Sequence, residues 1–393
     1  MHFNSKHPEP KSGQLFGRSH GCVTLSSFRT MTSNRIYNFS SGPAVMPLPV
    51  LERARDEFLS LSGVGMSAME LSHRSTHFGR ILEKAEAGLR EALGVPDTYR
   101  VLFLQGGASL QFSMVPMNLL PTGGTADYVV TGYWGMKALD EVDRLAKSNV
   151  IYSGEATGFC SVPEQSELRI SPDAAYIHYT SNETIDGVEF KYELDGFGTP
   201  VVCDASSNIL SKPIDLEKYD LIYAGAQKNI GPSGVTVVII RDDLLERSPE
   251  TLPTLLNYRT IAENGSMANT PNTWGVYMIG LVCDWLKEQG GVAAMQVRNE
   301  EKAAILYDAI DTSDGFYAGH ADRRCRSVMN VTFRMASEEL DEKFCAEAEA
   351  LGLDGLRGHR SVGGIRASIY NAFPRDGVEA LVSFMKDFAS RNG

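Results

Sequence analysis

Seven short apolar runs between residues 97 and 241 constrain the fold more than any other feature of the sequence. The runs are, in order, RVLFLQ, ADYVVTG, NVIYSG, AAYIHYT, TPVVCDAS, DLIYAG and GVTVVIIR, and helical stretches separate them. Several are nearly continuous in apolar residues, which is typical of strands buried on both faces. The pattern predicts an α/β fold with a mostly parallel seven-stranded sheet, helices on both faces and a ligand site at the carboxyl ends of the strands.

The rest of the chain divides around this sheet. We expect a large domain over residues 34–290, with two amphipathic helices ahead of the sheet and a long helical stretch after it. Residues 34–46 are expected to pack with the small domain or with a partner subunit. A domain change is predicted near Gly290 and Gly291. Residues 291–393 then alternate between helices and strands, as expected for a smaller α+β C-terminal domain.

Composition excludes several classes of partner. The 393 residues carry a formal net charge of −12, which argues against nucleic acid or an anionic membrane as a main partner, since both need a basic face, but leaves local cationic pockets for small anions possible. No apolar stretch approaches the roughly 20 residues of a membrane span. The six cysteines are scattered without CxxC spacing, which indicates neither a disulfide framework nor a cysteine zinc site. A reducing compartment, the cytoplasm, fits best.

Residues 1–33 form a predicted disordered extension. Glu9 is their only acidic residue, and they show no helical or strand period. Their basic, acid-poor composition is like that of an organelle transit peptide. A start site assigned too far upstream, with Met31 as the real beginning, explains the segment equally well, so an organelle is the alternative location.

Lys228 lies between the run DLIYAG and a glycine-rich bend. An ammonium with a reference pKa of about 10.4 is protonated at neutral pH and is a poor nucleophile, so a catalytic lysine needs burial or a nearby cation to lower its pKa. A strand end that opens into a cleft supplies both conditions. The alternative is a solvated loop lysine.

Asp204 ends the apolar run that precedes the one leading to Lys228. Two successive strand ends therefore present a carboxylate and an amine to one cleft. Pyridoxal phosphate requires this pair, because the lysine forms a Schiff base with its aldehyde and the carboxylate stabilises its protonated pyridine nitrogen. A strand-end aspartate alone is more often a cap or a turn residue.

Two further stretches fit such a cofactor. The strand-to-helix turn LQGGASLQF offers the backbone N–H groups of Ala108 and Ser109 to a phosphate, although it matches neither GxxxxGK[ST] nor GxGxxG and could be a plain turn. Trp134 follows the run ADYVVTG, where its indole could stack on a pyridine ring or simply belong to the core.

A collinear set of segments resembles the phosphoserine aminotransferases, pyridoxal-phosphate enzymes of class V and fold type I. The segments are NFSSGPA, HRS, GGASLQF, HYTSNETIDG, DASSNILSKPID, YAGAQKNIGPSG, SMANTPNTW and GHRSVGGIRASIYNA. The resemblance runs from about Tyr37 to the C-terminus and omits only the extension.

The resemblance implies a role for each matching residue at the cofactor. Lys228 would be the Schiff-base lysine and Asp204 the partner of the pyridine nitrogen. Trp134 would stack on the ring, and Thr184 would hydrogen-bond its 3-hydroxyl. The cofactor phosphate would be held by Ala108, Ser109 and Gln227 and, from the other subunit, by Asn269 and Thr270. A homodimer with shared active sites is therefore expected.

One position departs from a branch of the family. That branch has an arginine where this chain has Ser109. Phosphate binding would then depend more on backbone amides and hydroxyls.

The implied substrates are small dianionic amino and keto acids. Glutamate and 3-phosphohydroxypyruvate would give 2-oxoglutarate and phosphoserine, a step in L-serine biosynthesis. Arg366 would bind the α-carboxylate as a bidentate pair that lysine cannot form. The substrate-binding residues would further include Ser41, His73 and Arg74, with His359 and Arg360 of the partner subunit for the distal anion. Any one of these arginines, taken alone, would more often form a surface or interdomain salt bridge.

Other functions fit the sequence less well. A serine–glyoxylate aminotransferase is the closest rival. A cysteine desulfurase is disfavoured, because no cysteine of this chain lies in a recognisable mobile-loop motif. A non-catalytic protein that binds phosphate or a nucleotide at QGGAS is the rival from another class. His73 and His77 have the spacing of a zinc pair, but the HExxH glutamate is missing, so no metal is expected. GPSGV does not match the GxSxG of serine hydrolases.

Overall fold

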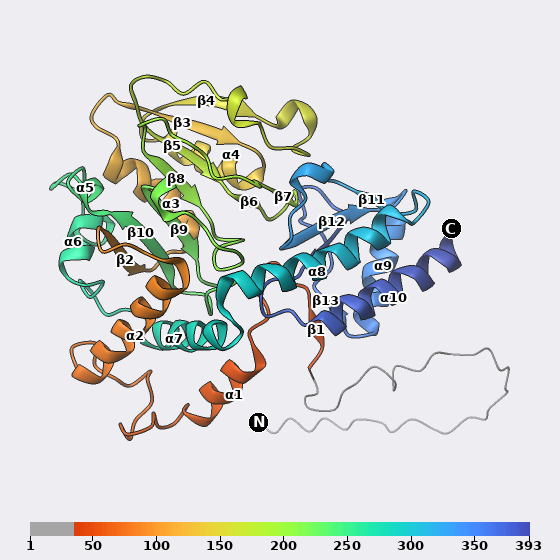
Figure 1. Cartoon of the computed structure of the whole chain (residues 1–393), viewed down its shortest axis with the longest axis horizontal. Helices are drawn as coiled ribbons and strands as arrows, with labels where there is room; N and C mark the ends of the chain where they lie inside the picture. Colours follow the sequence, from red (N-terminus) through yellow and green to blue (C-terminus); the bar gives the residue numbers. More distant parts are fainter. Residues whose placement is uncertain (1–34) are drawn as a thin grey trace, which may run out of the picture. The chain divides into compact units, whose positions relative to one another are not determined.

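A computed structural model of the chain describes residues 35–393 (Figure 1). The predicted extension over residues 1–33 lies outside the described residues. Among the helices of the described part, none combines the length and the apolar character of a membrane span.

The seven apolar runs form one sheet, which confirms the predicted mostly parallel α/β fold. The strands are β2 (Tyr99–Leu104), β3 (Thr125–Val130), β4 (Lys147–Ser153), β5 (Ala174–Thr180), β8 (Val201–Asp204), β9 (Leu221–Gly225) and β10 (Thr236–Arg241). Their order across the sheet is β2-β10-β9-β8-β5-β3-β4. β10 runs antiparallel to both neighbours, and the other pairs are parallel. The carboxyl ends of β5, β8 and β9 therefore lie side by side.

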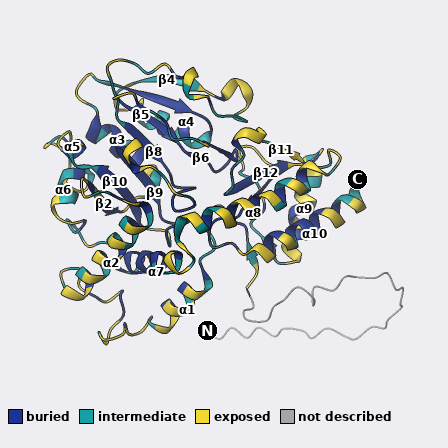
Figure 2. Cartoon of the chain, in the orientation of Figure 1, coloured by how far each residue is buried: buried dark blue, intermediate teal, exposed yellow. Residues whose placement is uncertain are grey.

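Helices cover both faces of the sheet, because successive side chains of its buried strands point to opposite sides. On one face, apolar strand residues pack with α1 (Leu48–Asp56), α2 (Thr76–Leu93) and α7 (Thr273–Glu288). The other face packs with α3 (Gly107–Leu119), α4 (Tyr133–Val142), α5 (Asp242–Leu245) and α6 (Tyr258–Glu263). Figure 2 shows the central strands as the most deeply buried part of the molecule.

The residues after Gly290 build a second group of elements. A three-stranded antiparallel sheet combines β11 (Ala318–Gly319), β12 (Asn330–Arg334) and β14 (Ile365–Ser368), and it packs with α8 (Gly291–Asp311), α9 (Glu338–Ala350) and α10 (Arg375–Asn392). Their apolar side chains form a cluster separate from those of the large sheet. Residues 36–393 nevertheless form one compact unit, so the predicted domain boundary stays a prediction.

The segment that follows residue 35 contacts the C-terminal elements. β1 (Tyr37–Asn38) pairs in parallel with β13 (Leu353–Asp354). The ring of Phe39 lies 4.4 Å from that of Phe373, centroid to centroid. Farther along, the backbone N–H of Ala44 donates to the carbonyl of Gln227 at 2.8 Å. This segment therefore reaches the bend that carries Lys228.

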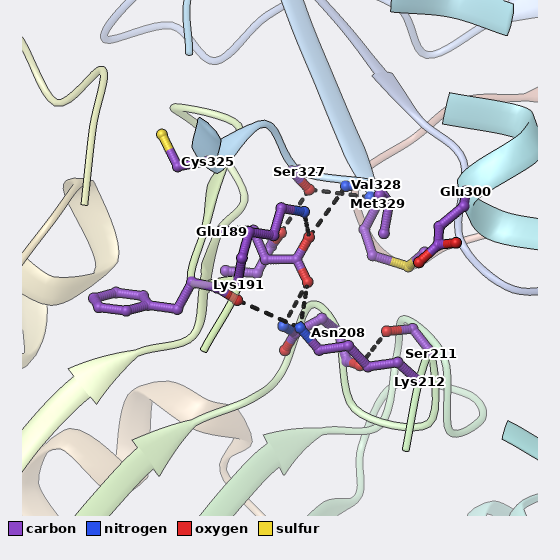
Figure 3. Close-up of polar contacts among 12 residues, drawn as sticks. Glu189, Lys191, Asn208, Ser211, Lys212, Glu300, Cys325, Ser327, Val328 and Met329 are labelled. Carbon is purple, nitrogen blue, oxygen red and sulfur yellow. Dashed lines mark hydrogen bonds and ion pairs between the residues drawn. The ribbon is translucent and has the colours of Figure 1, made fainter. Parts of the chain in front are cut away.

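A hairpin of β6 (Asn182–Glu183) and β7 (Val188–Glu189) joins the two groups of elements. Glu189 is 1% exposed, and its carboxylate accepts hydrogen bonds from Lys191 Nζ at 2.7 Å, Lys212 Nζ at 3.0 Å and the backbone N–H of Val328 at 3.2 Å (Figure 3). Burial alone would raise the pKa of Glu189, but Lys212 and Lys191 lower it to about 2. Both ends of the hairpin are therefore fixed by polar contacts, since Asn182 Nδ2 also donates to Asn330 Oδ1 at 2.9 Å.

Candidate active site

Lys228 lies in the bend that follows β9, at the carboxyl edge of the large sheet. Its Nζ donates to Thr184 Oγ1 at 2.8 Å and to Ser207 Oγ at 2.7 Å. Thr184 comes from the β6–β7 hairpin, and Ser207 from the loop after β8. Burial lowers the pKa of Lys228 to about 8, against the attraction of the Asp204 carboxylate. Roughly one amine in ten is then neutral at pH 7, far more than for a solvated lysine.

Asp204 is the last residue of β8, and the strand register places it between Thr180 of β5 and Tyr223 of β9. Its carboxylate is buried and accepts the backbone N–H of Ser206 at 2.9 Å. Burial raises its pKa, and no ion pair neutralises it among residues 35–393. A buried carboxylate without a bonded cation is costly, so the site favours a cationic ligand such as a protonated pyridine nitrogen.

Trp134 lies in the first turn of α4. Its ring centroid is 6.4 Å from that of Phe112 and 5.3 Å from that of Tyr133, and its buried Nε1 has no hydrogen-bond partner among residues 35–393. The indole is only partly buried at the margin of the apolar cluster, which leaves part of its surface for a ligand.

The predicted phosphate site lies at the start of α3. Gly106 and Gly107 adopt left-handed backbone angles, with φ of 93° and 69°, which glycine accepts without strain. The turn places Ala108 and Ser109 in the first helical turn, where backbone N–H groups have no partner within the helix. This geometry suits a phosphate. Gln227, another predicted phosphate ligand, directly precedes Lys228 in the bend after β9.

Asn269 and Thr270 lie in the loop before α7. Asn269 is half-buried and Thr270 is exposed. The Thr270 carbonyl accepts a hydrogen bond from Gln105 Nε2 at 3.1 Å, beside the α3 turn. Their role at the cofactor of another subunit stays a prediction.

Arg366 in β14 is a buried cation without an anion. It is 9% exposed, its Nε has no hydrogen-bond partner, and it forms no ion pair with the described residues. Burial lowers its pKa, whereas Tyr370 and Asp186 act in the opposite direction. Arg366 lines a small cavity with Asp186 and His320. A planar guanidinium there can form a bidentate pair with a carboxylate.

The other predicted substrate residues lie in several places. The Ser41 carbonyl accepts the Tyr370 hydroxyl at 2.8 Å. The ring of His359 lies 5.1 Å from that of Tyr133 in the same chain, whereas the resemblance assigned it to the partner's site, and that assignment stays a prediction. The remaining residues lie at or near the surface and have no described contact with Lys228: they are His73, Arg74 and Arg360.

Three site residues were missed from the sequence. Ser207 bridges Lys228 and Thr184, with 2.6 Å between the two hydroxyl oxygens. Glu183 and Asp186 bind the start of α4, the helix that carries Trp134. All three lie within segments already singled out, DASSN and SNETIDG, but no periodicity distinguishes them.

Comparison with known proteins agrees with this geometry. Residues 36–381 match the family described as Aminotransferase class-V. The chain is 55% identical to a phosphoserine aminotransferase of Laribacter hongkongensis, over 91% of this chain and 99% of that protein. A relative of the same name from Azotobacter vinelandii is 55% identical, over 92% of this chain and all of that protein.

Solved structures give the same result. A phosphoserine aminotransferase from Bacillus circulans subsp. alkalophilus has a TM-score of 0.90 at 51% identity, covering 92% of this chain and 100% of the other. One from Trichomonas vaginalis, described as PLP-bound, has a TM-score of 0.85 at 42% identity, covering 90% and 100%.

The fold and the site thus define a class V aminotransferase. Within that class, the chain belongs to the phosphoserine aminotransferase family. It is a transaminase, so the alternative of a non-catalytic phosphate-binding protein is wrong.

Proposed function

We propose that the chain catalyses reversible amino transfer between glutamate and 3-phosphohydroxypyruvate, giving 2-oxoglutarate and O-phospho-L-serine for L-serine biosynthesis. The observation that carries the proposal is the buried Lys228 amine, held by two hydroxyls near a buried carboxylate, Asp204, that forms no ion pair with residues 35–393. Relatives with this name cover nearly the whole chain, which supports the proposal.

Pyridoxal phosphate fits the residues at the sheet edge. Asp204 would pair with its ring nitrogen, Thr184 with its ring hydroxyl and Trp134 with its ring face. The phosphate would bind the first turn of α3 and Gln227, with Asn269 and Thr270 of the partner subunit. When bound, this cofactor supplies the electron sink that weakens a bond to the substrate α-carbon.

Lys228 carries the proton transfer in this proposal. Its lowered pKa keeps part of the amine neutral, so it can accept a proton from the substrate α-carbon as a general base and return it as an acid. The hydroxyls of Thr184 and Ser207 orient the amine through hydrogen bonds. Arg366 would hold the α-carboxylate and so fix which bond faces the amine.

The second anionic group of the substrate would bind His73 and Arg74 together with His359 and Arg360. A substrate with a neutral end would lack the charge-assisted hydrogen bonds that an anionic group forms with these side chains. The proposed substrates are therefore dianionic, and the proposed enzyme is a cytoplasmic homodimer.

The test is an assay of glutamate with 3-phosphohydroxypyruvate beside a panel of other keto acids. We expect phosphohydroxypyruvate to be the preferred acceptor, and borohydride reduction of the holoenzyme to fix the cofactor to Lys228. Lys228→Ala should fold but lose about 10² to 10⁴ in turnover. A preference for glyoxylate would instead support the serine–glyoxylate alternative.

Arg74→Ala tests the substrate site separately. It should reduce activity with phosphohydroxypyruvate far more than activity with a monoanionic keto acid. Equal losses with both acceptors would argue against the assigned site for the distal anion.

A further inference from the structure

Two buried carboxylates hold the first turn of α4, the helix that carries Trp134. Glu183 accepts the backbone N–H of Trp134 at 3.0 Å and that of Gly135 at 2.8 Å, each on a different oxygen. Asp186 accepts the backbone N–H of Tyr133 at 3.1 Å. Three successive N–H groups are thus bound by one hairpin, β6–β7.

The two glycines of GYWG make room for these carboxylates. A Cβ at position 132 would lie 2.5 Å from Asp186 Oδ2 and 2.6 Å from the Glu183 carboxyl carbon. Gly132 has an extended φ of 177°, which any residue can adopt, so the position requires glycine for space alone. At Gly135, a Cβ would lie 3.2 Å from Glu183 Oε1. The sequence is therefore fitted to the carboxylates on both sides of Trp134.

An ordinary helix cap would cost less free energy than a buried glutamate. Helix N-termini are usually capped by Ser, Thr, Asp or Asn, whereas Glu183 is a fully buried carboxylate without an ion pair among residues 35–393. Burial and the nearby Asp186 raise the pKa of Glu183 to about 8, although the N–H groups of Gly135 and Trp134 act against this rise. Departures of this kind from the usual local rules are expected at functional sites.

The hairpin that binds α4 also carries Thr184, which directly follows Glu183. Thr184 Oγ1 accepts a hydrogen bond from Lys228 Nζ at 2.8 Å. The same two-residue unit therefore positions the indole through a backbone contact and the Lys228 amine through a hydroxyl. Any rotation of the α4 turn would change the placement of Trp134 relative to both.

We propose that Glu183 and Asp186 are positioning residues, which fix the Trp134 indole relative to Thr184 and so set how a pyridoxal phosphate ring is held. The inference rests on the proposed function only for the identity of the ligand. Neither carboxylate needs to contact the substrate.

The test uses cofactor binding rather than turnover. Glu183→Gln keeps the shape of the side chain but turns an amide NH₂ toward a backbone N–H and loses one acceptor. We expect pyridoxal phosphate to bind the apoprotein roughly tenfold or more weakly, measured by equilibrium dialysis, which does not depend on Trp134 as a reporter. We also expect the visible circular dichroism of the bound cofactor to fall, because the ring is less firmly held. Gly132→Ala should have the same two effects by displacing the carboxylates, and it provides the test if Glu183→Gln does not fold.

Asp127→Asn is the matched control. Asp127 is another buried carboxylate, and it accepts the backbone N–H of Ser171 at 2.6 Å and the Ser171 hydroxyl at 2.8 Å. Asp127 lies in β3, away from the turn that carries Trp134. The control should lower the thermal midpoint while leaving the cofactor dissociation constant and the dichroism unchanged.

A double-mutant cycle with Trp134→Ala completes the test. If Glu183 acts through the indole, Glu183→Gln should weaken cofactor binding much less in the Trp134→Ala background. Additive effects would overturn the inference, as would a Glu183→Gln protein that loses stability yet binds the cofactor normally. A wild-type protein that does not bind pyridoxal phosphate would instead refute the proposed function.

Discussion

Two buried charges of opposite sign distinguish the active site at the scale of single residues. Glu189, by contrast, is a buried carboxylate with ion-pair partners, Lys191 and Lys212. Asp204 and Arg366 have no ion-pair partner among the described residues, although an unpaired buried charge costs several kcal/mol. A ligand with a cationic ring nitrogen and a substrate with a carboxylate would neutralise both charges.

The first residue-scale prediction concerns the pH dependence of Lys228 in the apoprotein. Its pKa of about 8 lies below the usual 10.5, so the neutral amine increases as the pH rises through 8. We expect the rate of covalent attachment of pyridoxal phosphate to rise about tenfold between about pH 7 and pH 9. Trapping with borohydride, followed by peptide mass analysis, measures this rate.

The stability of the apoprotein should also depend on the protonation of Lys228. Because the folded-state pKa of Lys228 lies below the unfolded value, the folded state binds fewer protons between pH 8 and 10.5. The Lys228 contribution to the free energy of unfolding therefore increases with pH across that window.

For the attachment experiment, Asp204→Asn is the control, since loss of the carboxylate should move the attachment midpoint to lower pH. A rate independent of pH would contradict the assigned pKa.

The second residue-scale prediction concerns Arg366. Arg366→Lys keeps the charge but loses the bidentate geometry, so kcat/KM for glutamate should fall about 10- to 100-fold, mainly through KM. Arg100→Lys is the control, because Arg100 forms an exposed ion pair with Asp242 at 2.8 Å. If Arg366→Lys left KM for glutamate unchanged, Arg366 would not be the carboxylate site.

At the scale of elements, a buried lysine holds the turn that follows β14. Lys302 in α8 donates from Nζ to the carbonyls of Ile369 at 3.0 Å, Tyr370 at 2.8 Å and Phe373 at 3.1 Å. The turn directly follows the strand that carries Arg366. Three carbonyl dipoles therefore stabilise one ammonium, and α8 is coupled to the substrate-binding strand.

This contact predicts the effect of Lys302→Met. Removing the ammonium leaves three buried carbonyls without their donor, so the free energy of unfolding should fall by about 3 kcal/mol or more, measured in urea. We also expect KM for glutamate to rise because the end of β14 is less well fixed. Lys343→Met, at a lysine with a half-exposed side chain, should change neither quantity. A stable Lys302→Met protein would show that water replaces the ammonium.

The large sheet could be predicted because its strands are continuous apolar runs, and Asp204 and Lys228 because they follow adjacent strands. The antiparallel direction of β10 could not be predicted, because an apolar run does not show the direction of a strand. The full length of α8, Gly291–Asp311, is hard to predict, because the buried polar residues Asn299 and Lys302 interrupt its apolar period. Glu183 lies in a two-residue strand, which is too short to show a period.

At the scale of the whole molecule, exposed apolar side chains between α1 and α2 fit the proposed homodimer. Four large apolar side chains between α1 and α2 are exposed: Phe58, Leu59, Met66 and Met69. Leu59 is the most exposed of them, at 81%. Monomers rarely expose such clusters, which are typical of protein interfaces. The patch directly precedes His73 and Arg74, so a homodimer that covers it would also bring these two residues toward an interface.

Shared active sites can be tested by mixing two inactive variants. Lys228→Ala removes the amine, and in the proposed shared site Asn269→Asp would place a carboxylate against the phosphate of the other subunit's cofactor. In a hybrid dimer, the one site that has Lys228 then faces an unchanged Asn269. After denaturation and refolding of an equal mixture, half of the dimers are hybrids with one intact site of two, so about one quarter of the wild-type activity should return. Each variant refolded alone is the control. An inactive mixture, with hybrid dimers confirmed by native mass spectrometry, would show that each subunit builds its site alone.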